Sequence, residues 1–407
     1  MSGLGYRGVE EATRMYNRIK EVALLFVVAT SVSMFSAGEA VYAGQMSPYA
    51  YAKITNEDNI FRAPINEQDD TISHLGAGLN EDFRIKQHSL LLNVLVDSAW
   101  YQTFDQLNHT KVDGRGTLLW EASRRWSGDI SYGYNRRLSS FDEQLVRQKD
   151  MRTMHDIFAS GNYKLSTDWQ VGGRLDYTDV FYEERNFLDT DVAGGQVEAL
   201  YRNTRGSHVG MRLRYTDHNL QDLTFNNSQI DNDFTETTLG GLVHWEKTSK
   251  SILDASLGIT SVSFNEIDSR DYDGWVGRLT YYWVPTGNTL FDMSAWQEVS
   301  TLDREVSGYV LSKGFSFRPV WSVTSKLKLD GLVMYSNDDF RGANLLEQIV
   351  TSAPREDDVW TYLLGVAWMP KDHLRVKFDY RHRDRVSSIN LRDFTVNQYN
   401  AELRIGF

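Results

Sequence analysis

Hydrophobic and polar residues alternate one by one along most of the chain from residue 49 onwards. In the stretch "DHLRVKFDYRHRDR", Leu374, Val376 and Phe378 alternate with Arg375 and Lys377. A period of two residues places successive side chains on opposite faces of a β-strand. The pattern therefore predicts a chain built of amphipathic strands, and no helical periodicity of useful length interrupts it after residue 44.

Segments of this kind recur to the end of the chain, and turn-forming residues separate them. We expect about 18 strands, an even number, with about 16 as the alternative count. The predicted strands cover residues 49–56, 72–86, 88–104, 112–126, 127–139, 155–166, 167–181, 191–204, 205–219, 234–247, 251–265, 272–284, 287–300, 305–319, 320–337, 357–369, 371–385 and 394–407.

The connections between these segments alternate in length. Tight connections are predicted at "KQH", "WSG", "LSTD", "TRGS", "KTSKS", "VPTGN", "RPVW" and "MPKD", and long polar ones lie between them. Bacterial outer-membrane barrels show this asymmetry, with short periplasmic turns and longer extracellular loops. If the first strand runs outward, every tight turn and the final residue fall on the periplasmic side.

The two faces of each strand need different surroundings. A charged strand face cannot lie in a protein core without partners, whereas a closed barrel offers lipid outside and water inside and leaves no backbone edge unpaired. Tryptophans also cluster near segment ends, as interfacial girdles do: Trp126, Trp169, Trp245, Trp283, Trp321 and Trp368. We therefore predict an all-β fold, a single transmembrane antiparallel up-and-down β-barrel over residues 44–407.

Composition narrows the classes of protein further. The mean hydropathy of −0.45 excludes a bundle of apolar membrane helices. The chain has no cysteine, which excludes disulfide scaffolds, zinc–thiolate sites, cysteine nucleophiles and a lipoprotein anchor. The net charge of −12 argues against nucleic acid as a partner.

The N-terminal segment has the three-part layout of a secretory signal peptide. Basic residues precede an apolar run at residues 22–35, and the sequence Val41-Tyr42-Ala43 before Gly44 fits a cleavage site. We predict that residues 1–43 are removed and that Met15 is the true start, with a retained anchor as the alternative. The expected location is the outer membrane of a Gram-negative bacterium.

The final stretch "NQYNAELRIGF" is an alternating strand that ends on an aromatic residue. Tyr399 and Phe407 lie on its apolar face. This strand resembles the C-terminal signal that the barrel-assembly machinery recognises in outer-membrane proteins. The resemblance implies that Phe407 and Tyr399 serve assembly, and that the partners include this machinery and outer-membrane lipid.

A barrel of about 18 strands leaves a water-filled lumen, because side chains fill only barrels of about eight strands. Inward-facing guanidinium and ammonium groups could bind the carboxylates or phosphates of a passing ligand. Acidic residues are interspersed with them, so pairing between neighbouring strands is the structural alternative. The candidate ligand track consists of Arg212, Arg214, Arg278, Arg375, Lys377, Arg381 and Arg383.

Catalysis finds little support in the sequence. The motifs G-x-S-x-G and H-E-x-x-H and the calcium-loop pattern are all missing from it. We expect no enzymatic activity, no catalytic residues, no cofactor and no metal.

A short motif follows the first predicted strand, "SPYAYAKIT": it is Asp58-Asn59-Ile60-Phe61-Arg62. This element resembles the beta-barrel porin 2 group, which includes EpsL-type barrels associated with exopolysaccharide gene clusters. The resemblance implies a passive outer-membrane conduit for a secreted polysaccharide, working with periplasmic export proteins. Residues 57–71 then form either a plug or latch, through Asp58, Asn59, Phe61 and Arg62, or a simple first outer loop.

Three functions therefore remain open at this point. The leading one is export of an extracellular polysaccharide through a charged, Arg-rich lumen. The alternative is a general or solute-specific uptake porin, and a third is a structural or adhesive barrel acting through its outer loops. An export barrel should bind long glycans, whereas a porin should conduct small solutes alone.

Overall fold

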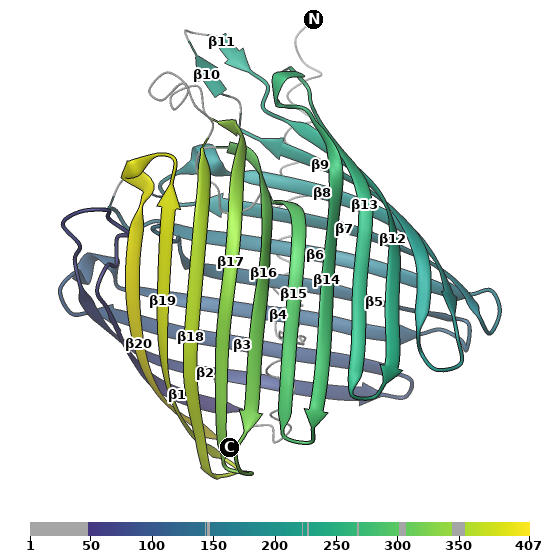
Figure 1. Cartoon of the computed structure of the whole chain (residues 1–407), viewed down its shortest axis with the longest axis horizontal. Helices are drawn as coiled ribbons and strands as arrows, with labels where there is room; N and C mark the ends of the chain where they lie inside the picture. The colour runs from purple at the N-terminus through teal and green to yellow at the C-terminus, as the bar shows by residue number, and fades with distance from the viewer. Residues whose placement is uncertain are drawn as a thin grey trace, which may run out of the picture.

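The computed structural model describes residues 48–407 except 143, 145–146, 222, 226–227, 267, 301–306 and 344–354. This part of the chain forms a closed antiparallel barrel of 18 strands (Figure 1). The prediction of an all-β barrel with 18 strands is therefore confirmed, and the count of 16 is wrong. The predicted signal peptide at residues 1–43, including Met15, and the mature start at Gly44 lie outside the described residues.

The barrel strands follow one another around the wall in chain order, with one interruption. They are β1 (Tyr49–Glu57), β2 (Asp70–Ile85), β3 (His88–Tyr101), β4 (His109–Glu121), β5 (Trp126–Leu138), β6 (Met151–Lys164), β7 (Trp169–Tyr182), β8 (Thr190–Arg202), β9 (His208–Leu220), β12 (Phe234–Thr248), β13 (Ser251–Phe264), β14 (Tyr272–Thr286), β15 (Thr289–Ser300), β16 (Ser307–Ser322), β17 (Leu327–Ala343), β18 (Glu356–Lys371), β19 (Leu374–Ser387) and β20 (Phe394–Gly406).

Short elements sit at the connections. The strands β10 (Leu223–Phe225) and β11 (Ser228–Ile230) form a separate hairpin between β9 and β12. Four 3-10 turns follow β3, β7, β13 and β19: η1 (Asp105–Leu107), η2 (Asn186–Leu188), η3 (Asp268–Arg270) and η4 (Asn390–Arg392). Among the described residues, no helix has the length and apolar character needed to cross a membrane.

The barrel closes because β1 pairs with both β2 and β20. Lys53 lies opposite His74 of β2 on one side and opposite Glu402 of β20 on the other. Every backbone edge of the wall therefore has a neighbour, as a chain that crosses a bilayer with strands requires.

Two predicted turns are wrong. The stretch "WSG" begins β5 at Trp126, and the turn precedes it at 122–125. The stretch "RPVW" lies inside β16, which continues to Ser322, and the turn follows at 323–326. Proline normally ends a central strand because it lacks an amide N–H. Here the β16–β17 pairing passes from Phe317 to Val320 without a bonded pair at Pro319, and Gly331 on β17 leaves room for the proline ring. The next strand therefore begins at Leu327 rather than at residue 320.

The barrel has a short-turn end and a long-loop end. The short-turn end contains the connections 86–87, 122–125, 165–168, 203–207, 249–250, 287–288, 323–326 and 372–373, and the long-loop end contains the others. Phe407 donates its backbone N–H to Pro48, and Gly406 donates to His373 of a short turn. The chain therefore ends at the short-turn end, beside the start of β1, as predicted (Figure 1).

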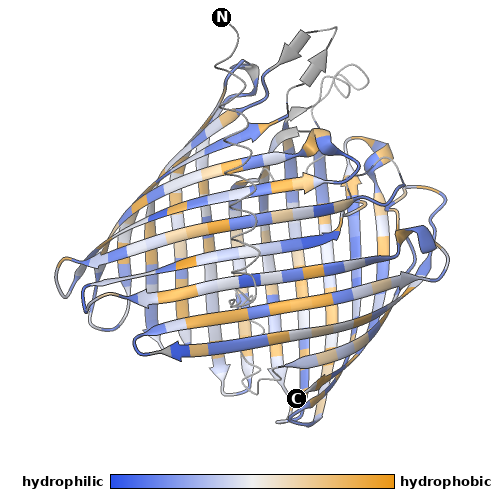
Figure 2. Cartoon of the chain, turned by 180° about the vertical axis from the view of Figure 1, so that it is seen from behind, coloured by the Kyte–Doolittle hydropathy of each residue, from blue (hydrophilic) through white to orange (hydrophobic). Residues whose placement is uncertain are grey.

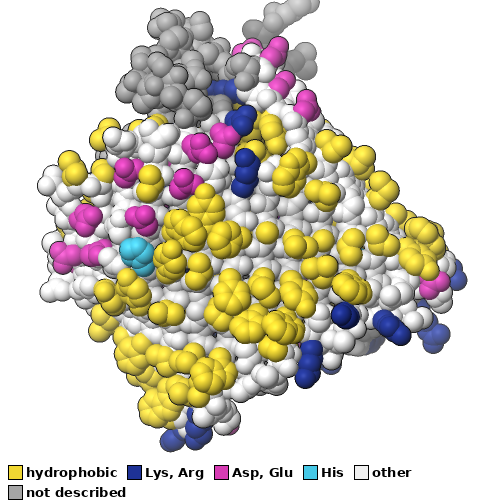
Figure 3. All heavy atoms as spheres, in the orientation of Figure 1, with side chains coloured by type: hydrophobic (Ala, Val, Ile, Leu, Met, Phe, Trp, Pro, Cys, Tyr) yellow, Lys and Arg dark blue, Asp and Glu magenta, His cyan; other side chains and the backbone are white. Residues whose placement is uncertain are grey.

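The apolar side chains face outward and the charged ones inward. Strands alternate between hydrophobic and hydrophilic positions along their length (Figure 2). Over β14–β20, hydrophobic side chains cover the middle of the outer surface and charged ones lie towards its ends (Figure 3). Leu175 and Ile259 are each 71% exposed on the described surface. Water could not cover such a surface favourably, whereas lipid can.

The six tryptophans named above all lie next to short turns. Each is between 42% and 52% exposed on the outer surface. Trp126 and Trp169 begin β5 and β7, where their rings contact Tyr163 and Tyr201. The predicted girdle is therefore present at the short-turn end. On the outer surface of β20, Tyr399 is 55% exposed, and Phe407 just beyond this strand is 77% exposed, while their role in assembly stays a prediction.

Candidate functional site: the basic wall and the loop clasp

A polar cavity of ≈ 330 Å³ lies against the lumen side of β16–β20 and β1. Six of its lining residues are Lys or Arg and three are Asp or Glu, so positive charge is in excess. We call this surface the basic wall. Its lining residues are Lys53, Arg318, Val320, Lys328, Asp330, Leu363, Arg375, Lys377, Asp379, Arg381, Gln398, Asn400 and Glu402.

Two of the three acidic residues of the basic wall are bound to cations of the same wall. Arg375 donates from Nη2 to Glu402 Oε1 at 2.8 Å. Lys377 Nζ lies 3.4 Å from Asp379 Oδ1. Arg381 lines the same cavity without a hydrogen bond or ion pair to any residue that the structure describes. Its guanidinium group is therefore available to a ligand.

Sequence periodicity identified part of this wall and missed the rest. Arg375, Lys377 and Arg381 were predicted as a ligand track and do line the cavity. Lys53 and Arg318 line it too but were not singled out. Arg318 fell in the predicted turn "RPVW", so no face could be assigned to it. The inward parity of Tyr49, Tyr51 and Lys53 on β1 was the signal that could have identified Lys53.

A second group of predicted arginines lies on β9, where each guanidinium has an acidic neighbour. Arg214 donates to Asp176 through Nη1 at 3.0 Å and Nη2 at 2.8 Å. Arg212 Nε lies 3.6 Å from Glu198 Oε2. We call Arg212, Arg214, Asp176 and Glu198 the paired wall. Gly194 on the intervening strand permits the long reach of Arg214, because a Cβ there would meet the Asp176 carboxylate.

Arg278 is another predicted track residue, and it lies on β14. It donates to Glu298 from Nε at 2.8 Å and from Nη2 at 2.5 Å. Its guanidinium carbon also lies 5.3 Å from the centroid of the Trp296 ring. Arg278 therefore faces the lumen as a neutralised pair, as Arg214 does.

The Asp58–Arg62 motif joins the first loop to β20. Asp58 accepts from Asn397 through the backbone N–H at 2.8 Å and the side-chain amide at 2.7 Å. Asn59 is fully buried, and its amide donates to Ala63 O at 2.9 Å and to Thr395 O at 3.0 Å. These contacts extend beyond the first hairpin, because Asn397 and Thr395 belong to β20.

The apolar pair of the motif packs with two other loops at the long-loop end. Ile60 and Phe61 form a buried cluster with Leu107 and Phe141. The Phe61 ring meets Phe104 edge-on at 4.9 Å and Phe141 at 5.0 Å between centroids. This cluster therefore connects the loops that follow β1, β3 and β5.

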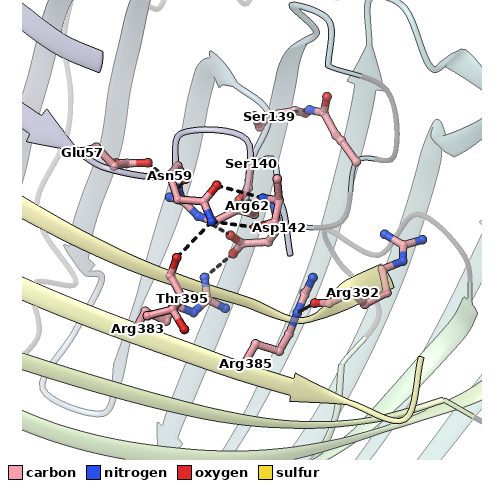
Figure 4. Close-up of polar contacts among 12 residues, drawn as sticks. Glu57, Asn59, Arg62, Ser139, Ser140, Asp142, Arg383, Arg385, Arg392 and Thr395 are labelled. Carbon is pink, nitrogen blue, oxygen red and sulfur yellow. Dashed lines mark hydrogen bonds and ion pairs between the residues drawn. The ribbon is translucent and has the colours of Figure 1, made fainter. Parts of the chain in front are cut away.

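Arg62 completes a polar contact that we call the clasp: Arg62, Asp142 and Arg383. Arg62 has a left-handed backbone (φ 54°), and its guanidinium binds Glu57 and donates from Nε to Asp142 Oδ1 at 3.1 Å. Arg383 of β19 donates to the other oxygen of Asp142 (Figure 4). Burial alone would raise the pKa of the Asp142 carboxyl, but Arg383 and Arg62 hold that pKa well below its ordinary value.

A metal site is absent from the described residues. Among them, no three His, Asp or Glu side chains gather in a way that could hold a metal ion. The site is therefore a charged passage, consisting of a basic wall in the lumen and a clasp near its long-loop end.

Comparison with known proteins identifies the family of this chain. A family model described as "Putative beta-barrel porin 2" matches residues 44–407. No curated protein matches the chain.

Several solved structures are similar to the chain at low sequence identity. Pseudomonas aeruginosa OccK2 (OpdF) in complex with glucuronate has 9% identity and a TM-score of 0.49, covering 89% of this chain and 98% of that one. A BenF-like porin from Pseudomonas fluorescens Pf-5 has 10% identity and a TM-score of 0.47, with the same coverage. Acinetobacter baumannii OccAB3 has 12% identity and a TM-score of 0.44, covering 89% and 99%. None of these scores extends a function to this chain.

Proposed function

Because the chain belongs to the beta-barrel porin 2 family, and is thus an outer-membrane β-barrel channel, we propose that it passes acidic solutes through its lumen. The solute that the basic wall fits best is an acidic polysaccharide on its way out of the cell. The observation that carries this proposal is the excess of six cations over three acids around the lumen cavity, with Arg381 unoccupied.

The arrangement of the cations supports a long ligand. Arg375, Lys377 and Arg381 share the inward face of β19, where alternate residues are ~7 Å apart. A polymer with repeated carboxylates can bind several of these groups at once, and guanidinium groups bind carboxylates in a planar, two-point geometry. Rings or rows of one charge also set the selectivity of a pore.

An uptake porin for small acidic solutes is the second candidate. The cavity volume of ≈ 330 Å³ favours it, because a space of this size suits one small molecule. Both candidates use the same basic wall, and they differ in the length of the solute that binds most tightly.

Two partners belong to the export proposal. Periplasmic export proteins would deliver the polymer to the short-turn end, which we place on the periplasmic side. The barrel-assembly machinery would recognise β20 through Tyr399 and Phe407. Both partnerships rest on the family resemblance.

Planar-bilayer conductance of the refolded chain from Gly44 tests the function. We expect anion selectivity and block by a long acidic polysaccharide, with little block by a neutral polymer of equal length. Arg381→Gln should weaken acidic block about tenfold, since it removes one charge-assisted contact. Arg115→Gln is the matched control, because Arg115 is also a lumen arginine but is bound to Asp156 at 2.8 Å.

The outcomes separate the candidates. Tight block by long acidic chains supports export, whereas block by short acidic sugars alone favours uptake. A channel that prefers cations, or that acidic and neutral solutes affect equally, would contradict both.

A further inference from the structure

The Asp142 carboxylate occupies a place where an acidic solute would bind. Arg383 follows Arg381 by two positions on the inward face of β19, so the two residues are ~7 Å apart along the strand. Arg381 has no partner among the described residues, whereas Arg383 is bound to Asp142. A carboxylate that moves along the basic wall towards the long-loop end would therefore reach Arg383 next. It would find this guanidinium group already bound by Asp142.

The contact between Asp142 and Arg383 spans part of the barrel mouth. Asp142 belongs to the segment between β5 and β6, and Arg383 belongs to β19. The strands β20, β1, β2, β3 and β4 lie between them around the wall. The ion pair thus holds Asp142 towards the β19 side, and its loss would free Asp142 from Arg383 while the contact with Arg62 remains (Figure 4).

The clasp is accessible to exchange. The side chains of Arg383 and Asp142 are 30% and 17% exposed, so a solute can reach them. A solute carboxylate offers Arg383 the same chemistry as Asp142 does. Asp142 is tethered, and a tethered group competes as if it were present at about millimolar concentration. A polymer with many carboxylates reaches a comparable local concentration, whereas a single carboxylate does so only at high bulk concentration.

We propose that Asp142 is a built-in competitor for Arg383, and that an acidic solute opens the long-loop mouth by displacing it. This inference rests on the proposed function, because it assigns the same solute class to the same row of cations. Phe141 packs against Phe61 beside the clasp, so Asp142 stays close to Arg383 and can bind it again after the solute has passed.

Single-channel recording of the refolded chain tests the proposal, with an oligogalacturonate as the acidic probe and a dextran of equal length as the neutral one. In the wild type, the acidic probe should raise the fraction of time spent fully open, and the dextran should not. Asp142→Asn should raise the open-to-closed ratio about tenfold without any probe and should no longer respond. Asp156→Asn should respond like the wild type, because Asp156 holds Arg115 between the wall strands β6 and β4 and belongs to no loop.

The folded state of each variant is checked by its heat-modifiable mobility on a gel. The proposal is wrong if folded Asp142→Asn opens no more often than the wild type. It is also wrong if dextran opens the wild-type channel as well as the acidic probe does. Failure of the proposed function looks different, since the wild-type channel would then show neither anion selectivity nor block by acidic polymers.

Discussion

The basic wall and the paired wall contain the same kinds of residues but present opposite surfaces to the lumen. On β9, Arg214 is neutralised by Asp176 two strands away, across a glycine. On β19, Arg381 forms no hydrogen bond or ion pair with any described residue, because the neighbouring Asp379 lies against Lys377. The number of arginines therefore does not define a ligand track. The availability of a partner within cross-strand reach decides whether an arginine stabilises the wall or binds a solute.

The largest effect on this contrast is expected from separating Arg214 from Asp176 on the paired wall. Gly194→Val would place side-chain atoms against the Asp176 carboxylate and Nη2 of Arg214. We expect a loss of about 1–3 kcal/mol in the free energy of unfolding, as is usual for overpacking, and a shift of the reversal potential towards anions as Arg214 is released. Denaturant unfolding of the refolded barrel measures the first effect and bilayer recording the second. Gly114→Val on β4 is the control, because nothing lies within 4 Å of a Cβ at Gly114.

A milder change should convert a paired arginine into a free one without harming the fold. Glu298→Gln removes the charge that neutralises Arg278. Both side chains are about two-fifths exposed, so we expect the free energy of unfolding to change by less than about 1 kcal/mol. The anion-to-cation permeability ratio should rise by a measurable amount. Unchanged selectivity would show that lumen charges outside the basic wall do not contribute.

The smallest expected effect is the change of the open fraction with pH near neutrality, which depends on the clasp. The pKa of the Asp142 carboxyl is lowered in the folded state. The ion pairs of Asp142 therefore stabilise the closed mouth fully above the ordinary aspartate pKa of about 4, and this stabilisation disappears as pH falls towards the lowered pKa. The open fraction should therefore be the same at pH 7 and at pH 5 and should rise only below about pH 4. Asp142→Asn should lack this rise, and a rise in the wild type between pH 7 and pH 5 would contradict the assignment.

Alternation along the chain was sufficient to predict the barrel, its strand number and the two ends. It could not predict the end of β16, because the effect of Pro319 depends on a missing pair and on a glycine in the next strand. It also could not separate Arg214 from Arg381, because both have inward parity. Only the register between strands reveals which of them meets an acid.

The clasp was beyond any local pattern. Asp142 and Arg383 are separated by 241 positions, and no periodicity relates a loop residue to a strand on another part of the wall. The Asp58–Arg62 motif was visible in the sequence, but its contacts with β20 and with Phe141 were not. Contacts such as Asp142–Arg383 form only because the barrel closes, so they can be identified only from the three-dimensional structure.

The pairing of β1 with β20 also has a consequence for the order of folding. Thr55 bonds to Asn400 at 2.7 Å across 345 positions, and contacts of such long range form slowly because loop closure precedes any gain. All the other strand pairs can form between neighbours along the barrel sequence, whereas the seam must wait for the last strand to arrive. Asp58, bound to Asn397 just beyond the seam, then fixes the completed ring. The barrel therefore gains its final stability in one late step.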